Sequence, residues 1–290
     1  MTNDQQVYLP FFDTPTRVLP SLPSKEVLER VQLEKYRLDC LVRTGSVPFE
    51  DVRRGAEPPD FEVMCAESWR RLDCVALTIK QKRLAEALFT KLIEKVAIAG
   101  EDRPLEHLAG TQVAMWFGHG SQLPPRATDH STVTEIVDSL VQVEVDREGI
   151  AKLTADIAAH GFPEKFPSGF TVVDTQRFGF QVTPVDSWQP SNALSEQLGF
   201  DLSLSYTLAI TDIYSELQRL VSGHDNGKID ELLVVVGGPN RDGICFPAEH
   251  LFGPWLRENP VEPLTAQHIS RVTAHVWLSG DVLDLPLRNL

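Results

Sequence analysis

The sequence predicts an α/β protein with a mixed central sheet flanked by helices. Strand-like and helix-like patterns alternate along the chain, which is typical of this class. The composition, with 42% hydrophobic and 23% charged residues, is that of an ordinary globular protein. A length of 290 residues is enough for one elaborated domain or two modest ones.

The expected compartment is the cytoplasm. No apolar run reaches the roughly 20 residues that a membrane helix needs, and the first residues lack the pattern of a signal peptide. The four cysteines are far apart and form no CxxC pair, which argues against a zinc site and a disulfide framework. They are Cys40, Cys65, Cys74 and Cys245. We therefore expect reduced thiols and no membrane contact.

Charge is distributed unevenly along the chain. The net charge is −14, yet residues 25–100 hold 14 basic and 13 acidic residues, and the excess acid lies almost entirely in 101–290. A phosphate backbone attracts Lys and Arg and repels acid. Nucleic acid is therefore expected to bind, if at all, through residues 25–100. The acidic C-terminal part is expected to face a protein partner or form a homodimer surface.

The N-terminal segments are an extended arm and a helix. Residues 1–24 contain four prolines and predict an extended arm. Ser24 is a suitable N-cap for a helix over 25–43, where Val27, Val31, Leu38 and Leu41 fall on one face. These residues are expected to face the core. Position 34 continues the same spacing but is not apolar: it is Glu34, a carboxylate within an apolar stripe.

A hairpin, a helix and a strand follow. Segments 60–67 and 70–79 predict two strands joined by a tight turn, and 80–98 predicts a strong amphipathic helix. An apolar strand is expected at 111–117. These elements suggest a core over 25–120 and an acidic α+β extension over 121–290, which we expect to pack on the same sheet. Within the extension we expect a hairpin over 170–186, a helix over 205–223 and a buried strand over 231–238.

Two carboxylates of the hairpin carry the main functional hypothesis. Asp60 opens the first strand and Asp73 lies near the start of the second, so pairing of the strands can bring both acids to one end of the sheet. Two hard oxygen ligands there would hold Mg²⁺ or Mn²⁺, with waters and phosphate oxygens completing the shell. Glu34 is expected to supply a third carboxylate.

This segment resembles the PD-(D/E)xK phosphodiesterase superfamily, which has the restriction-endonuclease-like fold. Pro59-Asp60 matches the first motif and Asp73-Cys74-Val75 a degenerate second motif. The resemblance covers residues 25–120. It implies a restriction-endonuclease-like core, metal binding by the two acids and the helix Glu, and a role as a nuclease in prokaryotic antiviral defence or DNA processing.

Val75 stands where the family has its lysine. Lys80 and Lys82 follow the strand closely, Lys91 and Lys95 lie further along the next helix, and spacing does not choose among these four lysines. The expected catalytic residues are Asp60 and Asp73 with one of these lysines, and Lys80 and Lys82 are the first candidates. The expected nucleic-acid contacts are basic residues near the hairpin: Arg70, Arg71, Lys80, Lys82 and Arg83.

Two alternatives remain open from the sequence. The same scaffold can serve as a catalytically inactive interaction or regulatory subunit, which the charge of −14 and Val75 both favour. Residues 25–120 can also be an ordinary α/β core, with the function lying in residues 130–290.

Overall fold

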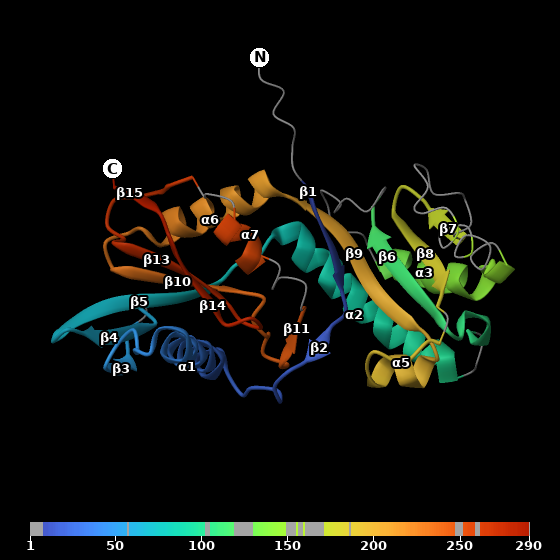
Figure 1. Ribbon diagram of the computed structural model, residues 1–290, viewed down its shortest axis with the longest axis horizontal. Helices are drawn as coiled ribbons and strands as arrows, with labels where there is room; N and C mark the ends of the chain where they lie inside the picture. The colour runs from blue at the N-terminus through green and yellow to red at the C-terminus, as the bar shows by residue number, and fades with distance from the viewer. Residues whose placement is uncertain are drawn as a thin grey trace, which may run out of the picture. The chain divides into compact units, whose positions relative to one another are not determined.

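The structure is a computed structural model that divides into two compact units (Figure 1). Unit 1 holds Pro15–Ile79 and Ala209–Leu290, and unit 2 holds Tyr8–Thr14 and Lys80–Leu208. The described residues are 8–56, 58–101, 105–118, 130–148, 155, 159, 171–185, 187–246, 252–258 and 262–289. Lys80–Leu208 of unit 2 is thus inserted between the two stretches of unit 1, and Tyr8–Thr14 of unit 2 precedes them.

Unit 1 contains a mixed six-stranded sheet with the strand order β14-β13-β10-β5-β4-β3. Strands β3, β4 and β5 form an antiparallel meander, β10 pairs in parallel with both β5 and β13, and β14 returns antiparallel to β13. The strands are β3 (Asp51–Arg54), β4 (Phe61–Cys65), β5 (Ser68–Ala76), β10 (Glu231–Val236), β13 (Arg271–Val276) and β14 (Asp281–Leu285). The α/β class with a mixed sheet is therefore confirmed.

Helices lie on both faces of this sheet. Figure 1 shows α1 (Lys25–Thr44) on one side, and α6 (Ile210–His224) and α7 (Phe252–Glu258) on the other. Two small strand pairs complete unit 1. They join β2 (Thr16–Arg17) to β11 (Ile244–Cys245) and β12 (Leu264–Ala266) to β15 (Leu287–Asn289).

Helix α1 begins and ends where the sequence predicts. The Ser24 hydroxyl accepts a hydrogen bond from the backbone amide of Val27, which caps the first turn. Gly45 ends the helix in the left-handed region with a φ of 75°, and its amide donates to the carbonyl of Leu41. The 20 residues between these caps contain neither glycine nor proline.

The predicted buried face of α1 is wrong. The buried residues are Glu29, Gln32, Leu33, Tyr36 and Cys40, whereas Val27, Leu38 and Leu41 are exposed. Both series have helical spacing, so periodicity alone does not choose between them. The larger side chains Leu33 and Tyr36 pack into the core of the sheet.

The core of unit 1 joins α1 to the centre of the sheet. Leu33 and Tyr36 pack with Phe61 and Val63 of β4, and with residues of β5 and β10. All six residues of β10 are buried, as expected for a central parallel strand covered on both faces.

Unit 2 contains a second sheet, with the strand order β1-β9-β6-β8-β7. Strand β6 pairs antiparallel with β8 and in parallel with β9. The strands are β1 (Tyr8–Asp13), β6 (Thr111–Phe117), β7 (Thr171–Asp174), β8 (Phe178–Pro184) and β9 (Asp201–Ala209). The helices include α2 (Lys80–Glu101), α3 (His130–Gln142) and α5 (Ala193–Leu198), with a 3₁₀ turn, η1 (Glu106–Leu108).

The division of the chain differs from the expected core over 25–120. The helix and strand expected at 80–98 and 111–117 both form, but they belong to unit 2 rather than to the sheet of the hairpin. The expected helix over 205–223 is correct only from Ile210, because residues 205–209 continue β9. Among the described residues, no helix combines the length and the apolar character needed to cross a bilayer.

The two faces of α1 can be compared by one pair of substitutions. Leu33→Ala is expected to lower the free energy of unfolding by about 2–5 kcal/mol, because Leu33 is fully buried (0% exposed) and its truncation leaves a cavity. Leu38→Ala should change it by less than about 0.5 kcal/mol, because Leu38 is exposed. Urea denaturation followed by circular dichroism measures both, and equal costs would contradict the assigned face.

Candidate functional site

The structure brings Asp60 and Asp73 together at the end of the β4–β5 hairpin. The register pairs Phe61 with Leu72, which makes Asp60 and Asp73 the next cross-strand pair. The backbone amide of Asp60 donates to Oδ1 of Asp73 at 2.8 Å, and the amide of Cys74 donates to Oδ2 of Asp60 at 3.0 Å. We call this reciprocal pair of hydrogen bonds the aspartate clasp.

Both aspartates of the clasp are buried. Burial raises the pKa of Asp60, the Cys74 amide lowers it, and the negative charges of Asp73 and Glu29 raise it further; the net direction is upward. A buried carboxyl with a raised pKa beside a second carboxyl is a feature of functional sites, because folding alone does not favour such an arrangement.

Glu29 of α1, and not the expected Glu34, is the carboxylate whose negative charge raises the pKa of Asp60. Its side chain is buried, its Oε1 lies 2.8 Å from Nζ of Lys25, and its Oε2 lies 2.9 Å from Nη1 of Arg54. Both cations compensate its charge. Sequence reasoning missed Glu29 because it followed the wrong face of the helix. The spacing of Glu29 to Leu33 and Tyr36 would have identified it.

Glu34 is not at the site, so its assignment as a metal ligand is corrected. Its carboxylate lies 2.7 Å from Nη2 of Arg30 and 3.8 Å from Nη1 of Arg37, on the exposed side of α1. The reason is the rotation of the helix, which exposes Val27, Leu38 and Leu41 and leaves only Val31 of this series packed partly against the core.

His224, at the C-terminal end of α6, faces Asp73. Leu72 and Cys74 pack toward α1, and alternation along β5 therefore turns Asp73 to the other face of the sheet. There Nε2 of His224 lies 3.9 Å from Oδ2 of Asp73. Its Nδ1 contacts the carbonyl of Leu220 at 2.7 Å, and because a carbonyl only accepts, Nδ1 carries the proton. When His224 is neutral, the hydrogen bond at Nδ1 leaves the lone pair on Nε2, on the side of Asp73.

The thiol of Cys74 is not a nucleophile. Burial raises the pKa of the Cys74 thiol, and the negative charge of Asp60 raises it further. The thiol donates to Oε1 of Gln32 at 3.6 Å. Only thiolates are strong nucleophiles, so Cys74 is a packing residue.

The carboxylates of the clasp fit a divalent cation that keeps most of its waters. In the hydrogen bonds formed within the described chain, Asp60 uses Oδ2 and Asp73 uses Oδ1. One oxygen of each carboxylate therefore remains for a ligand. No group of three or more His, Cys, Asp or Glu side chains in the described ranges is arranged to hold a metal ion. Mg²⁺ commonly binds through only one or two carboxylates and completes its shell with water and phosphate oxygens.

Three of the expected basic residues, Arg70, Arg71 and Lys82, are ion-paired with carboxylates of the chain. Nη1 of Arg70 lies 2.7 Å from Oε1 of Glu231, and Arg71 makes two side-chain hydrogen bonds to the carboxylate of Asp230. Lys82 is buried and ion-paired with Glu86, so the expectation that it contacts phosphate is corrected.

The candidate lysines all belong to unit 2, whereas the clasp belongs to unit 1. The side chain of Lys80 lies outside the described residues. Lys91 is exposed on α2, as is Arg83, and Nζ of Lys95 donates to the hydroxyl of Thr134 at 2.8 Å. The choice of a replacement for the lysine missing at Val75 therefore stays open.

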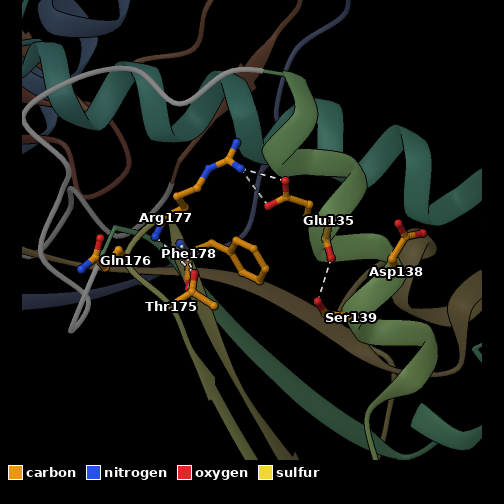
Figure 2. A pocket seen from close by; sticks show the side chains of 7 residues that line it. All are labelled: Glu135, Asp138, Ser139, Thr175, Gln176, Arg177 and Phe178. Atoms are coloured by element: carbon orange, nitrogen blue, oxygen red, sulfur yellow. Dashed lines mark hydrogen bonds and ion pairs between the residues drawn. The ribbon is translucent and has the colours of Figure 1, made fainter.

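A second candidate site is a hollow of about 460 Å³ in unit 2, between α3 and the β7–β8 turn (Figure 2). Arg177 reaches across it and makes hydrogen bonds of 2.8 and 3.0 Å to the two carboxylate oxygens of Glu135. The hydroxyls of Ser131 and Thr132 accept two more. The guanidinium that would otherwise attract an anion is thus satisfied internally, and the hollow supports no specific chemistry.

No protein-family model, no curated protein and no solved structure matches this chain.

Replacing Asp60 tests whether its charge is retained at a cost to stability. The pKa of Asp60 in the folded protein is raised above its unfolded value of about 3.9. Protonated Asp60 therefore stabilises the folded state below that value, and this stabilisation is lost as the pH rises through the folded pKa. Asp60→Asn keeps an oxygen that can accept from the Cys74 amide but removes the charge. We expect the variant to be more stable toward unfolding than wild type at pH 7, and the difference to shrink toward pH 4.

Urea unfolding at several pH values measures this effect. The matched control is Asp51→Asn, an exposed aspartate of β3 that should leave stability nearly unchanged. An Asp60→Asn protein that is less stable than wild type across the whole range would show that the carboxylate is only a structural brace.

Proposed function

We propose that unit 1 is a restriction-endonuclease-like core and that the protein is a metal-dependent phosphodiesterase acting on nucleic acid. The observation that carries this proposal is the aspartate clasp at the end of the β4–β5 hairpin. Its two carboxylates occupy the positions that the PD-(D/E)xK resemblance assigns to metal ligands.

The order of elements in unit 1 supports the same fold. A helix, an antiparallel three-stranded meander, a second helix and a parallel strand follow one another as α1, β3-β4-β5, α6 and β10. The second helix and the parallel strand come from α6 and β10, beyond the inserted unit 2, rather than from residues 80–117 as the sequence suggested. Glu29 of α1 takes the place of the helix carboxylate.

Each residue of the site has a role that its geometry allows. Asp60 Oδ1 and Asp73 Oδ2 would hold Mg²⁺ or Mn²⁺, which polarises a scissile phosphate and lowers the pKa of an attacking water. The clasp fixes both carboxylates, so little reorganisation is needed on binding. His224 Nε2 can accept a hydrogen bond from a water beside Asp73 and so orient it. The positive charge of Lys25 lowers the pKa of Asp60, and with Arg54 it compensates the charge of Glu29 on the side of α1.

A second candidate function is a catalytically inactive interaction or regulatory subunit on the same scaffold. The observation that favours it is Val75, which occupies the position of the family's lysine and is partly buried. In this case the clasp only ties β4 to the end of β5.

A cleavage assay separates the two functions. Purified protein with Mg²⁺ or Mn²⁺ is expected to cleave labelled DNA or RNA, and Asp60→Asn and Asp73→Asn should each lower the rate by about a hundredfold or more, because each removes a charged metal ligand. Asp51→Asn, on the same sheet but exposed, should cleave like wild type.

The two outcomes are distinct. Cleavage that survives in both clasp variants comes from a contaminant or another site and contradicts the proposal. Absence of cleavage on single- and double-stranded DNA and RNA, with folded protein and either metal, favours the inactive subunit.

A further inference from the structure

A buried histidine of β13 joins α1 to the sheet of unit 1. His275 is fully buried (0% exposed), and its Nε2 lies 2.7 Å from Oδ2 of Asp39 on α1. Burial opposes the ionisation of Asp39, but hydrogen bonds from Lys35 and His275 outweigh it and lower the pKa of this carboxyl. An ionised carboxylate only accepts hydrogen bonds, so Nε2 of His275 carries a proton and donates it to Asp39.

The other ring nitrogen of His275 lies in apolar surroundings. Nδ1 is buried and makes no hydrogen bond within the described part of the chain. The rings of Tyr36 and Trp277 pack edge-on against the imidazole, with centroid distances of 5.7 and 6.4 Å. The strand register places Val235 of β10 and Val282 of β14 on either side of His275. A second proton on this ring would therefore be a buried charge whose N–H finds no acceptor, which is costly.

Charged groups of α1 act on the imidazole in opposite directions. Burial lowers the pKa of His275, the Asp39 carboxylate raises it, and the positive charges of Lys35 and Arg43 lower it again; the net direction is downward. His275 is therefore neutral at pH 7 and resists protonation for as long as it stays buried.

Other titratable groups near the ring leave this balance unchanged. Burial raises the pKa of the Tyr36 phenol and of the Cys40 thiol, so both are neutral at pH 7. The carboxylates of β10 and β14 are ion-paired with arginines: Glu231 with Arg70, Asp281 with Arg43 and Arg257, and Asp284 with Arg271.

The contact holds the C-terminal half of α1. Nη2 of Arg43 lies 2.9 Å from Oδ1 of Asp281, so Asp39 and Arg43 both tie the last turns of the helix to β13 and β14. On the opposite face Leu38 and Leu41 are exposed, so this part of α1 is buried along its inner face. A segment that is packed on one side can open locally at a lower free energy than the whole unit.

We infer that the Asp39–His275 pair is an acid-sensitive contact, which holds the C-terminal half of α1 on the sheet at neutral pH and lets it open in acid. When the helix end opens, His275 reaches water and binds a proton with the ordinary imidazole pKa of about 6.5. This proton must leave before the helix can close. The device does not depend on the proposed phosphodiesterase activity.

The direction of the pH effect follows from the lowered pKa of buried His275. The stabilisation supplied by neutral His275 is fully present above about pH 6.5 and is lost as the pH falls toward the pKa of the buried ring. Because opening binds one proton in this range, the opening equilibrium constant should increase by up to about tenfold for each pH unit.

Amide hydrogen exchange of the full chain between about pH 5 and 7.5, corrected for the intrinsic pH dependence of exchange, measures this opening. Wild type should show the expected increase over residues 36–44 below about pH 6.5. His275→Gln keeps a donor near the position of Nε2 but binds no proton, so its opening constant should stay nearly constant. The matched control is His268→Gln, whose native ring is 51% exposed, and it should behave like wild type.

Strand β10 is the internal reference, because the contact acts on α1. Its amides should keep their protection in the samples in which residues 36–44 lose theirs. An equal acid-induced loss of protection in α1 and β10 overturns the inference, as does a folded His275→Gln protein with the pH dependence of wild type.

A titration of wild type by nuclear magnetic resonance needs no variant at this position. The ring resonances of His275 should stay unchanged between about pH 7.5 and 6 in the folded protein, whereas an exposed imidazole titrates near 6.5. The variant His275→Gln serves only to assign these resonances. A His275 ring that takes up a proton at or above about pH 6.5 in the folded chain overturns the inference.

Discussion

The site of this protein depends on the reciprocal hydrogen bonds between Asp60 and Asp73. Each carboxylate accepts a backbone amide from the opposite strand, which ties the start of β4 to β5 and fixes two like charges in a buried place. The repulsion between these charges and their desolvation both oppose folding, as the raised pKa of Asp60 shows. A structure that keeps such a pair needs either a compensating cation or a fold stable enough to tolerate it.

Helix α1 supports the clasp from one face of the sheet and offers a different surface to solvent. Its inner face combines packing residues such as Leu33 with Glu29, whose negative charge raises the pKa of Asp60 and is compensated by Lys25 and Arg54.

The secondary structure of unit 1 was largely predictable, because its signals are local. Ser24 caps α1, the alternation around Asp60 and Asp73 predicts the hairpin, and the apolar run of β10 predicts a buried strand. The assignment of elements to sheets was not predictable in this way. Residues 80–208 interrupt unit 1 between β5 and α6, and strand β6, which follows the hairpin in sequence, pairs in another sheet. No local pattern reports that β5 will pair with a strand more than 150 residues later.

Within the site, the two aspartates were found because both flank a recognisable hairpin. The sequence pattern does not identify Glu29, because α1 has two faces with apolar residues at helical spacing and only the packing of the folded chain decides which face is buried. His224 was missed because its partner Asp73 is brought to it only by the pairing of β5 with β10 and the placement of α6.

The most direct test of the central claim is an anomalous diffraction measurement on crystals soaked in Mn²⁺. If the clasp holds a divalent metal, one manganese peak is expected within coordinating distance of Oδ1 of Asp60 and Oδ2 of Asp73, with His224 near the water shell of the ion. A fully soaked crystal with no peak between these two carboxylates, and with the clasp intact, would contradict it.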